Sequence, residues 1–170
     1  MADISLLSVL VDTSYLITLY DDGRPNHKTA KTYFKYLLEN KIKIYLSTIV
    51  ISEFQQGQSV VDLINNGKYI VLPFNYEDAI KSAELAFNLG GQNRSQGGET
   101  AAKQKDDIKI MGQAEQKKID FILTEDESTL TRYAGRLSGA GIFSPKIIKM
   151  SDKFDSSWFN NGQASLLTNN

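Results

Sequence analysis

Short apolar runs alternate with longer amphipathic stretches along most of the chain. Each short run, rich in Val, Ile and Leu, indicates a buried strand, whereas apolar residues spaced three and four apart indicate a helix. The expected strands are residues 6–11, 41–47, 69–74, 120–124 and 146–150. The expected helices are residues 14–20, 28–39, 49–56, 60–64, 76–89, 99–118 and 127–137.

Strands that alternate with helices predict a parallel sheet with right-handed crossovers. The expected fold is therefore α/β, a single domain with three α/β/α layers around a central parallel sheet of four to five strands. The length of 170 residues fits one domain, which we assign to residues 1–153. Residues 154–170 are expected to be a weakly ordered C-terminal tail that packs at most through Trp158 and Phe159.

Two segments carry more specific expectations. The apolar spacing of helix 76–89 predicts an inward face of five residues, Ala79, Ile80, Ala83, Ala86 and Phe87. Residues 90–98 are rich in Gly, Gln and Ser and cannot bury a core, so a mobile loop is expected there, either a plain connector or a functional lid.

Composition narrows the chemistry that the chain can perform. The hydrophobic fraction of 41% and charged fraction of 23% are ordinary for a globular protein and exclude a membrane class. Zero cysteines exclude disulfides and thiolate metal sites, and the single histidine, His27, excludes multi-histidine metal sites. A metal ion would therefore be held by carboxylate oxygens, which favours Mg²⁺ or Mn²⁺.

Charge and the N-terminal residues bear on partners and location. The net charge of −1 and pI of about 5.9 give no basic footprint, which counts against a dedicated DNA-binding module but not against an enzyme that grips a nucleic acid locally. The first residues lack the basic start of a signal peptide, and Asp12 interrupts the apolar run that follows. A cytoplasmic location is expected.

Four acidic residues occupy positions that the apolar pattern assigns to the interior or to a sheet edge. Asp12 and Asp126 follow the first and fourth strands, at the carboxyl edge where α/β sheets bind ligands. Glu53 shares a helix face with buried residues, and Asp107 heads the apolar stripe of its helix. Buried carboxylates need partners, so these four are expected to converge on one or two divalent ions, roughly 3.5–4 Å apart if two.

Each acid also has a structural alternative. Asp12 and Asp126 are residue types that cap the helices following them. Asp107 is also explained as a first-turn acid that complements the helix dipole, a role for which Asp106 is equally suited. Glu53 has the alternative of extending from the helix flank into water.

At these positions the chain resembles PIN-domain ribonucleases, in particular the small bacterial toxins of the VapC type. Four short segments carry the resemblance: VDTSYL (11–16), STIVISEF (47–54), DIKIMGQA (107–114) and FILTED (121–126). Two features depart from the family: the stretch 90–98 is long and flexible, and small residues of the third segment are replaced by Lys109, Gly112 and Gln113.

The resemblance implies an acidic Mg²⁺ or Mn²⁺ site formed by Asp12, Glu53, Asp107 and Asp126. It further implies three supporting hydroxyls, those of Thr13, Ser14 and Thr124. The implied activity is metal-dependent hydrolysis of phosphodiester bonds in RNA by a metal-activated water. Asp12 and Asp107 would be central ligands, with Glu53 and Asp126 flanking.

The implied partners are an RNA substrate, a second copy of the chain in a homodimer and, for a toxin, a cognate antitoxin whose C-terminal segment blocks the acidic pocket. No membrane partner is expected. The residues available to grip RNA are Arg24, Lys28, Arg94, Lys103, Lys105, Arg132 and Arg136, most of which are also explained as solvated surface charge.

Three other functions compete with this interpretation. Phosphatases of the haloacid-dehalogenase type need Asp-x-Asp after the first strand, but Ser14 replaces the second acid. Adhesion modules of the von Willebrand A type bind Mg²⁺ through Asp-x-Ser-x-Ser, but Leu16 stands at the last position. The third alternative is a catalytically inactive PIN fold that serves as a binding or scaffold protein.

Overall fold

A parallel sheet of five strands forms the centre of the molecule in the computed structural model, which describes residues 7–90 and 99–162. Its strand order is β3-β2-β1-β4-β5, and every pairing is parallel. The strands are β1 (Ser8–Val11), β2 (Lys43–Ser47), β3 (Ile70–Leu72), β4 (Phe121–Thr124) and β5 (Lys146–Lys149). The expected parallel sheet is confirmed, with five strands.

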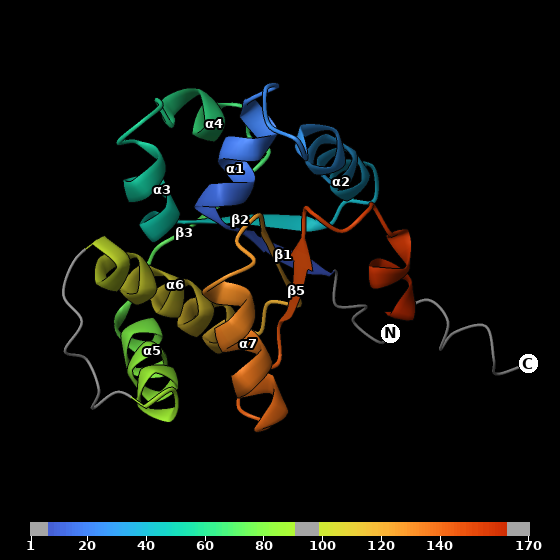
Figure 1. Cartoon of the computed structure of the whole chain (residues 1–170). Coiled ribbons are helices and arrows are strands. Elements are labelled where there is room, and N and C mark those ends of the chain that lie inside the picture. Colours follow the sequence, from blue (N-terminus) through green and yellow to red (C-terminus); the bar gives the residue numbers. More distant parts are fainter. Residues whose placement is uncertain (1–6, 91–98, 163–170) are drawn as a thin grey trace, which may run out of the picture.

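Helices cover both faces of this sheet (Figure 1). Above it in the view lie α1 (Thr13–Tyr20), α2 (His27–Glu39), α3 (Thr48–Phe54) and α4 (Val61–Asn65). Below it lie α5 (Tyr76–Asn88), α6 (Glu99–Gln116) and α7 (Leu130–Gly139). The three-layer α/β/α arrangement predicted from the alternation of strands and helices is confirmed.

The central strand β1 and its neighbour β4 carry the longest fully buried runs. All four residues of β1 and all four of β4 are buried, which is why their sequences are apolar on both faces. Val11 pairs with Leu46 of β2 on one side and Leu123 of β4 on the other, so Asp12 emerges directly beside Thr124. The Asp12 amide donates to the Leu123 carbonyl at 3.0 Å, which extends the pairing of β1 and β4 by one residue.

The chain reverses its direction across the sheet between β1 and β4. From β1 it moves outward through β2 to β3, and then it crosses back to continue through β4 to β5. Neighbouring strands from which the chain continues in opposite directions form a topological switch point, and the crevice at their carboxyl ends is the usual ligand site of an open α/β sheet. Asp12 and Thr124 stand at that point.

Several elements are shorter than the sequence pattern predicts, β3 and α7 (Leu130–Gly139) among them. The third strand covers only Ile70–Leu72, because Pro73 supplies no amide for a further ladder bond and Asn75 already caps α5. The last predicted helix begins at Leu130 and not at residue 127, since the preceding residues form a turn.

The inward face predicted for α5 is wrong at four of its five positions. Ala86 is buried, but Ala79, Ile80, Ala83 and Phe87 are exposed. The residues that α5 buries are Asp78, Ser82, Leu85 and Ala86. This helix packs on α6 through polar and small side chains, which a search for apolar periodicity does not detect.

Gly112 and Gln113, the departures noted in the α6 segment, both serve the contact between α5 and α6. A Cβ at Gly112 would lie 2.2 Å from Ser82 Oγ and 2.7 Å from Ser82 Cα, so only glycine fits. Gln113 is fully buried and donates through Nε2 to the Pro73 carbonyl at 3.0 Å and to Asp78 Oδ2 at 3.3 Å. Both replacements therefore have a structural explanation.

The residues after β5 return to the core. The 3₁₀ helix η1 (Ser156–Gly162) buries Phe159, whose ring lies against Phe121 and Tyr33 at centroid distances of 5.1 and 6.3 Å. Residues 163–170 and 91–98, including most of the expected loop and Arg94, lie outside the described residues. Among the helices that are described, none is both long and apolar enough to cross a membrane.

Replacing Gly112 by Ala should destabilise the fold. The added methyl collides with backbone atoms of Ser82, so α5 and α6 must move apart, at a cost of about 1–3 kcal/mol in the free energy of unfolding. Urea denaturation measures this change. Gly135→Ala in α7 is the control, because nothing lies within 4 Å of the new methyl and the change should be neutral or stabilise by about 0.4–1 kcal/mol.

Candidate active site

Two hydroxyl groups hold the carboxylate of Asp12 at the carboxyl ends of β1 and β4. Asp12 is only 5% exposed, and its Oδ2 accepts hydrogen bonds from Ser14 Oγ at 2.6 Å and Thr124 Oγ1 at 2.8 Å. The two hydroxyl oxygens are 3.1 Å apart. A buried carboxylate requires such donors, and both of them here donate to one oxygen. Oδ1 takes part in neither bond.

Asp12 occupies the N-cap position of α1, but its side chain makes no capping hydrogen bond. The helix-cap alternative is therefore wrong for this carboxylate. It turns instead toward Thr124 on the neighbouring strand.

Asp126 is joined to the same unit through Thr124. Its amide donates to Thr124 Oγ1 at 2.9 Å, so the Thr124 hydroxyl connects the main chain of one acid with the carboxylate of the other. Asp126 Oδ1 accepts from the amide and hydroxyl of Ser128, at 2.7 and 2.8 Å, and from the Thr129 amide at 3.1 Å. Asp126 therefore stabilises the turn before α7, whose N-cap is Thr129, and does not cap the helix itself. The same turn keeps Asp126 beside Thr124.

A third hydroxyl, that of Thr13, binds Glu53 to the residue that follows Asp12. The helix that carries Glu53, α3, begins after β2 with Ser47 as its N-cap, whose side chain accepts from the Ile49 amide at 3.1 Å. Thr13, the residue after Asp12, donates a short hydrogen bond to Glu53 Oε2. Glu53 is partly buried.

Asp107 is a buried acid in the interior of α6. It is 5% exposed, and α6 starts at Glu99, so Asp107 is not a first-turn acid and that alternative is wrong. Its neighbour Asp106 faces outward and pairs with Lys109 at 2.7 Å. Because α6 packs against α3, Asp107 lies on a helix adjacent to the one that carries Glu53.

The carboxylates and hydroxyls at this edge are the kinds of ligand that a hard cation prefers, but the acids lie too far apart to surround an ion in this structure. Carboxylate oxygens and hydroxyls are the ligands that Mg²⁺ and Mn²⁺ prefer. Within residues 7–90 and 99–162, no three acidic or histidine side chains are gathered closely enough to hold an ion. Carboxylates repel one another, so a closer arrangement of these acids needs a cation between them. His27 is directed elsewhere, with Nδ1 at 3.0 Å from the Thr18 carbonyl.

Two residues at this edge are absent from the sequence prediction. The Glu125 amide donates to Ser14 Oγ at 2.9 Å, and Glu125 Oε1 accepts from Asn26 Nδ2 at 2.8 Å. The acidic run around Asp126 is a weak signal for Glu125. Asn26 lies in a run of turn-forming residues and carries no signal of its own.

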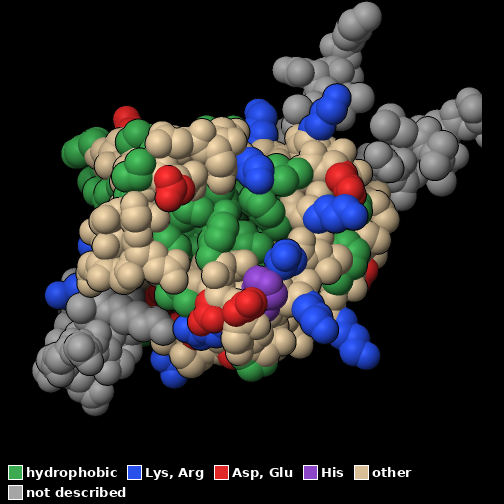
Figure 2. Space-filling view, turned by 90° about the horizontal axis from the view of Figure 1, so that it is seen from above, with side chains coloured by type: hydrophobic (Ala, Val, Ile, Leu, Met, Phe, Trp, Pro, Cys, Tyr) green, Lys and Arg blue, Asp and Glu red, His purple; other side chains and the backbone are tan. Residues whose placement is uncertain are grey.

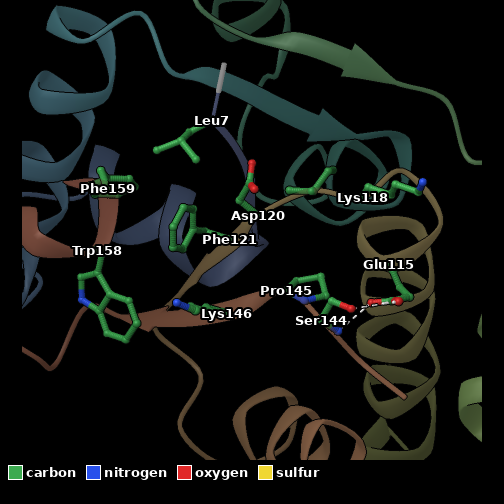
Figure 3. Close-up of a pocket in the computed structure, with 11 residues that line it drawn as sticks. Leu7, Glu115, Lys118, Asp120, Phe121, Ser144, Pro145, Lys146, Trp158 and Phe159 are labelled. Carbon is green, nitrogen blue, oxygen red and sulfur yellow. Dashed lines mark hydrogen bonds between the residues drawn. The ribbon is translucent and has the colours of Figure 1, made fainter. Parts of the chain in front are cut away.

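The clearest hollows lie away from the acidic edge. One, of about 510 Å³, is at the amino ends of the strands, between Leu7, Phe121, Lys146 and Trp158 (Figure 3). Another, of about 530 Å³, lies between α2 and the turn before β3. Hollow volume alone would therefore not identify the site that buried carboxylates and strand topology indicate.

Replacing Thr124 by Val should destabilise the protein by about 1–3 kcal/mol, because it leaves the Asp126 amide without its acceptor and the buried Asp12 carboxylate with one donor fewer. Thr124→Ser keeps the hydroxyl and should recover most of that loss. Urea unfolding of the two variants provides the measurement. Equal stability of both variants would contradict the role assigned to the hydroxyl.

Comparison with known proteins agrees with this geometry. The PIN domain family matches residues 9–136, and no curated protein sequence matches the chain. Solved structures share the fold at low sequence identity. The DNA-bound VapBC of Salmonella typhimurium has a TM-score of 0.58 at 15% identity and covers 85% of this chain and 99% of its own.

Two further structures give the same result. VapBC2 of Rickettsia felis, bound to a promoter DNA fragment, has a TM-score of 0.57 at 15% identity, covering 88% of this chain and 100% of its own. FitAcB of Neisseria gonorrhoeae has a TM-score of 0.57 at 18% identity, covering 84% and 98%. Since the family match spans most of the chain and includes both central strands, this protein belongs to the PIN domain family.

Proposed function

We propose that this protein is a metal-dependent endoribonuclease that hydrolyses phosphodiester bonds in single-stranded or loop RNA at the carboxyl edge of its sheet. The observation that carries the proposal is the buried carboxylate of Asp12, held by Ser14 and Thr124 at the switch point between β1 and β4. Membership of the PIN domain family supports it, as do the bonds that link Asp126 to Thr124 and Glu53 to Thr13.

In this proposal Asp12, Asp107 and Asp126 hold Mg²⁺ or Mn²⁺, and Glu53 completes the acidic set. The ion supplies an activated water and stabilises the leaving oxygen. The protein's own hydroxyls hold the acids in place: Ser14 and Thr124 hold Asp12, while Thr13 holds Glu53. Because the Glu125 and Asp126 amides bind the hydroxyls of Ser14 and Thr124, the Asp12 carboxylate is already oriented before a cation and substrate bind.

The phosphatase alternative lacks a general acid in this structure. Ser14, at the second position of the required Asp-x-Asp, donates to Asp12 and cannot act as that acid. The inactive scaffold remains the second candidate function, and the following substitutions separate it from a nuclease.

Asp12→Asn and Asp107→Asn should each lower RNA cleavage by about 100-fold or more, because a neutral amide cannot replace a carboxylate in binding a cation. Cleavage of mixed RNA with added Mg²⁺ or Mn²⁺ measures the loss. Asp106→Asn is the matched control, since this adjacent acid pairs with Lys109 on the surface and should leave cleavage unchanged.

The outcomes distinguish the two functions. Cleavage by Asp12→Asn and Asp107→Asn at the parent rate would refute the metal nuclease. A parent protein that binds the divalent ion but cuts no RNA would favour the scaffold. Chelation by EDTA should abolish cleavage by the parent, and added Mg²⁺ should restore it.

We further propose that the chain acts as a toxin in the cytoplasm, as a homodimer restrained by a cognate antitoxin. The hollow between α2 and the turn before β3 offers a partner surface with apolar walls and three lysines, Lys31, Lys35 and Lys68. Figure 2 shows hydrophobic side chains at the centre of this face with basic side chains along part of its rim. Such a surface suits an amphipathic, acidic segment of an antitoxin.

Expression of the intact chain alone should arrest growth of a bacterial host, whereas Asp12→Asn should not, because toxicity would come from RNA cleavage. Colony counts after induction measure the effect. Arrest by both proteins at equal expression would argue against a nuclease toxin. Light scattering of the purified protein reports whether it is a dimer.

A further inference from the structure

One hydrogen bond ties the connection between α1 and α2 to the acidic edge. Asn26 Nδ2 donates to Glu125 Oε1 at 2.8 Å, across a separation of 99 residues. Glu125 Oε2 is buried and accepts no hydrogen bond from the described residues. Asn26 is therefore the only described hydrogen-bond donor to this partly buried carboxylate, and losing that donor is costly where water does not replace it.

The main chain of Glu125 belongs to the hydroxyl arrangement that holds Asp12. Its amide donates to Ser14 Oγ at 2.9 Å, and Ser14 Oγ donates to Asp12 Oδ2 at 2.6 Å. Asn26 is thus linked through Glu125 to Ser14, which orients the Asp12 carboxylate. A shift of the α1–α2 connection would be transmitted directly to this edge.

The connection itself has a defined shape. Asp21 Oδ1 accepts from the Gly23 amide at 3.0 Å, the Asp21 carbonyl accepts from the Arg24 amide at 3.1 Å, and the Arg24 carbonyl accepts from the His27 amide at 3.1 Å. It can therefore present side chains in fixed directions once Asn26 anchors its end.

Two cations stand two residues to either side of Asn26. Arg24 and Lys28 are both exposed, and a separation of two residues keeps each Cα within about 8 Å of that of Asn26. Figure 2 shows basic and acidic side chains gathered beside the single histidine, His27. Arg24 Nε is 3.6 Å from Asp21 Oδ2 in a largely exposed pair, which is weak enough to be exchanged for a phosphate.

We propose that Asn26 and Glu125 are positioning residues that clamp the α1–α2 connection beside the acidic edge, so that Arg24 and Lys28 bind RNA phosphates flanking the cleaved bond. This inference rests on the proposed ribonuclease function. An edge built from carboxylates repels a polyanion, so substrate binding there needs cations at a fixed distance from the acids. The net charge of −1 makes local placement of those cations necessary.

Asn26→Ala and Glu125→Ala should raise KM for a single-stranded RNA oligonucleotide about tenfold, the scale of losing one or two phosphate contacts, with kcat changed less than twofold. Glu125→Gln keeps the acceptor oxygen and should behave like the parent. Asn26→Asp alone places two carboxylates side by side and should raise KM. In the double variant Asn26→Asp with Glu125→Gln, the amide of residue 125 donates to the carboxylate of residue 26, so the hydrogen bond forms again in the reverse direction and KM should return to the parent value.

Lys146→Ala is the control. Lys146 lies at the opposite edge of the sheet, so this change should leave KM as it is in the parent.

RNA affinity falls as salt rises, and the slope of log affinity against log salt reports the number of phosphate contacts. Arg24→Ala and Lys28→Ala should each make this slope shallower by about one. Binding is measured on Asp12→Asn protein, so it is recorded even if the chain proves not to cut RNA. Hydrogen exchange without RNA tests the clamp by itself, and Asn26→Ala should speed exchange of the Arg24 and His27 amides about tenfold or more.

These readouts separate the two proposals. Inactivity of the parent toward RNA would refute the ribonuclease alone, while the exchange rates still report on the clamp. Unchanged exchange and unchanged KM in Asn26→Ala would overturn the clamp, as would a Glu125→Gln variant whose KM rises as much as that of Glu125→Ala. Unaltered salt dependence in both cation variants would overturn the assignment of Arg24 and Lys28 to phosphate.

Discussion

The burial of one carboxylate between two strands is the constraint on which this structure depends most. Asp12 follows a strand that is buried on both faces, so its charge has almost no access to water and must be met by donors. Ser14 and Thr124 meet it from α1 and β4. Each hydroxyl also accepts an amide from the loop after β4, so the carboxylate, the start of α1 and that loop form one rigid unit.

The remaining architecture supports this edge from both layers. On one face α1 and α3 are joined by the hydrogen bond from Thr13 to Glu53, which holds a second acid near the first. On the other face α6 carries the buried Asp107 and packs against α3, and its close contact with α5 depends on the absence of a side chain at Gly112. The path of the chain across the sheet, reversing between β1 and β4, leaves the crevice into which such side chains can project.

Several polar residues serve the fold and the proposed site together. Asp126 caps the turn before α7 with one oxygen, and its amide is bound by the hydroxyl that orients Asp12. Glu125 and Asn26 extend this arrangement to the α1–α2 connection, where cations stand beside the acids. In the proposed nuclease, whose net charge is −1, such local pairing of acidic and basic groups would replace a general basic surface for binding a polyanion.

The alternation of strands and helices and the position of Asp12 at the end of β1 can be predicted from the sequence, because they follow from local periodicity and from the point where an apolar run stops. The buried face of α5 cannot be predicted in this way. Asp78 is buried there because Gln113 and Lys117, far along the chain, bind its carboxylate, whereas Phe87 is exposed. The hydrogen bond between Asn26 and Glu125 could likewise not be predicted from the sequence. Its partners are 99 residues apart, and no local pattern encodes a contact that exists only after the sheet has formed.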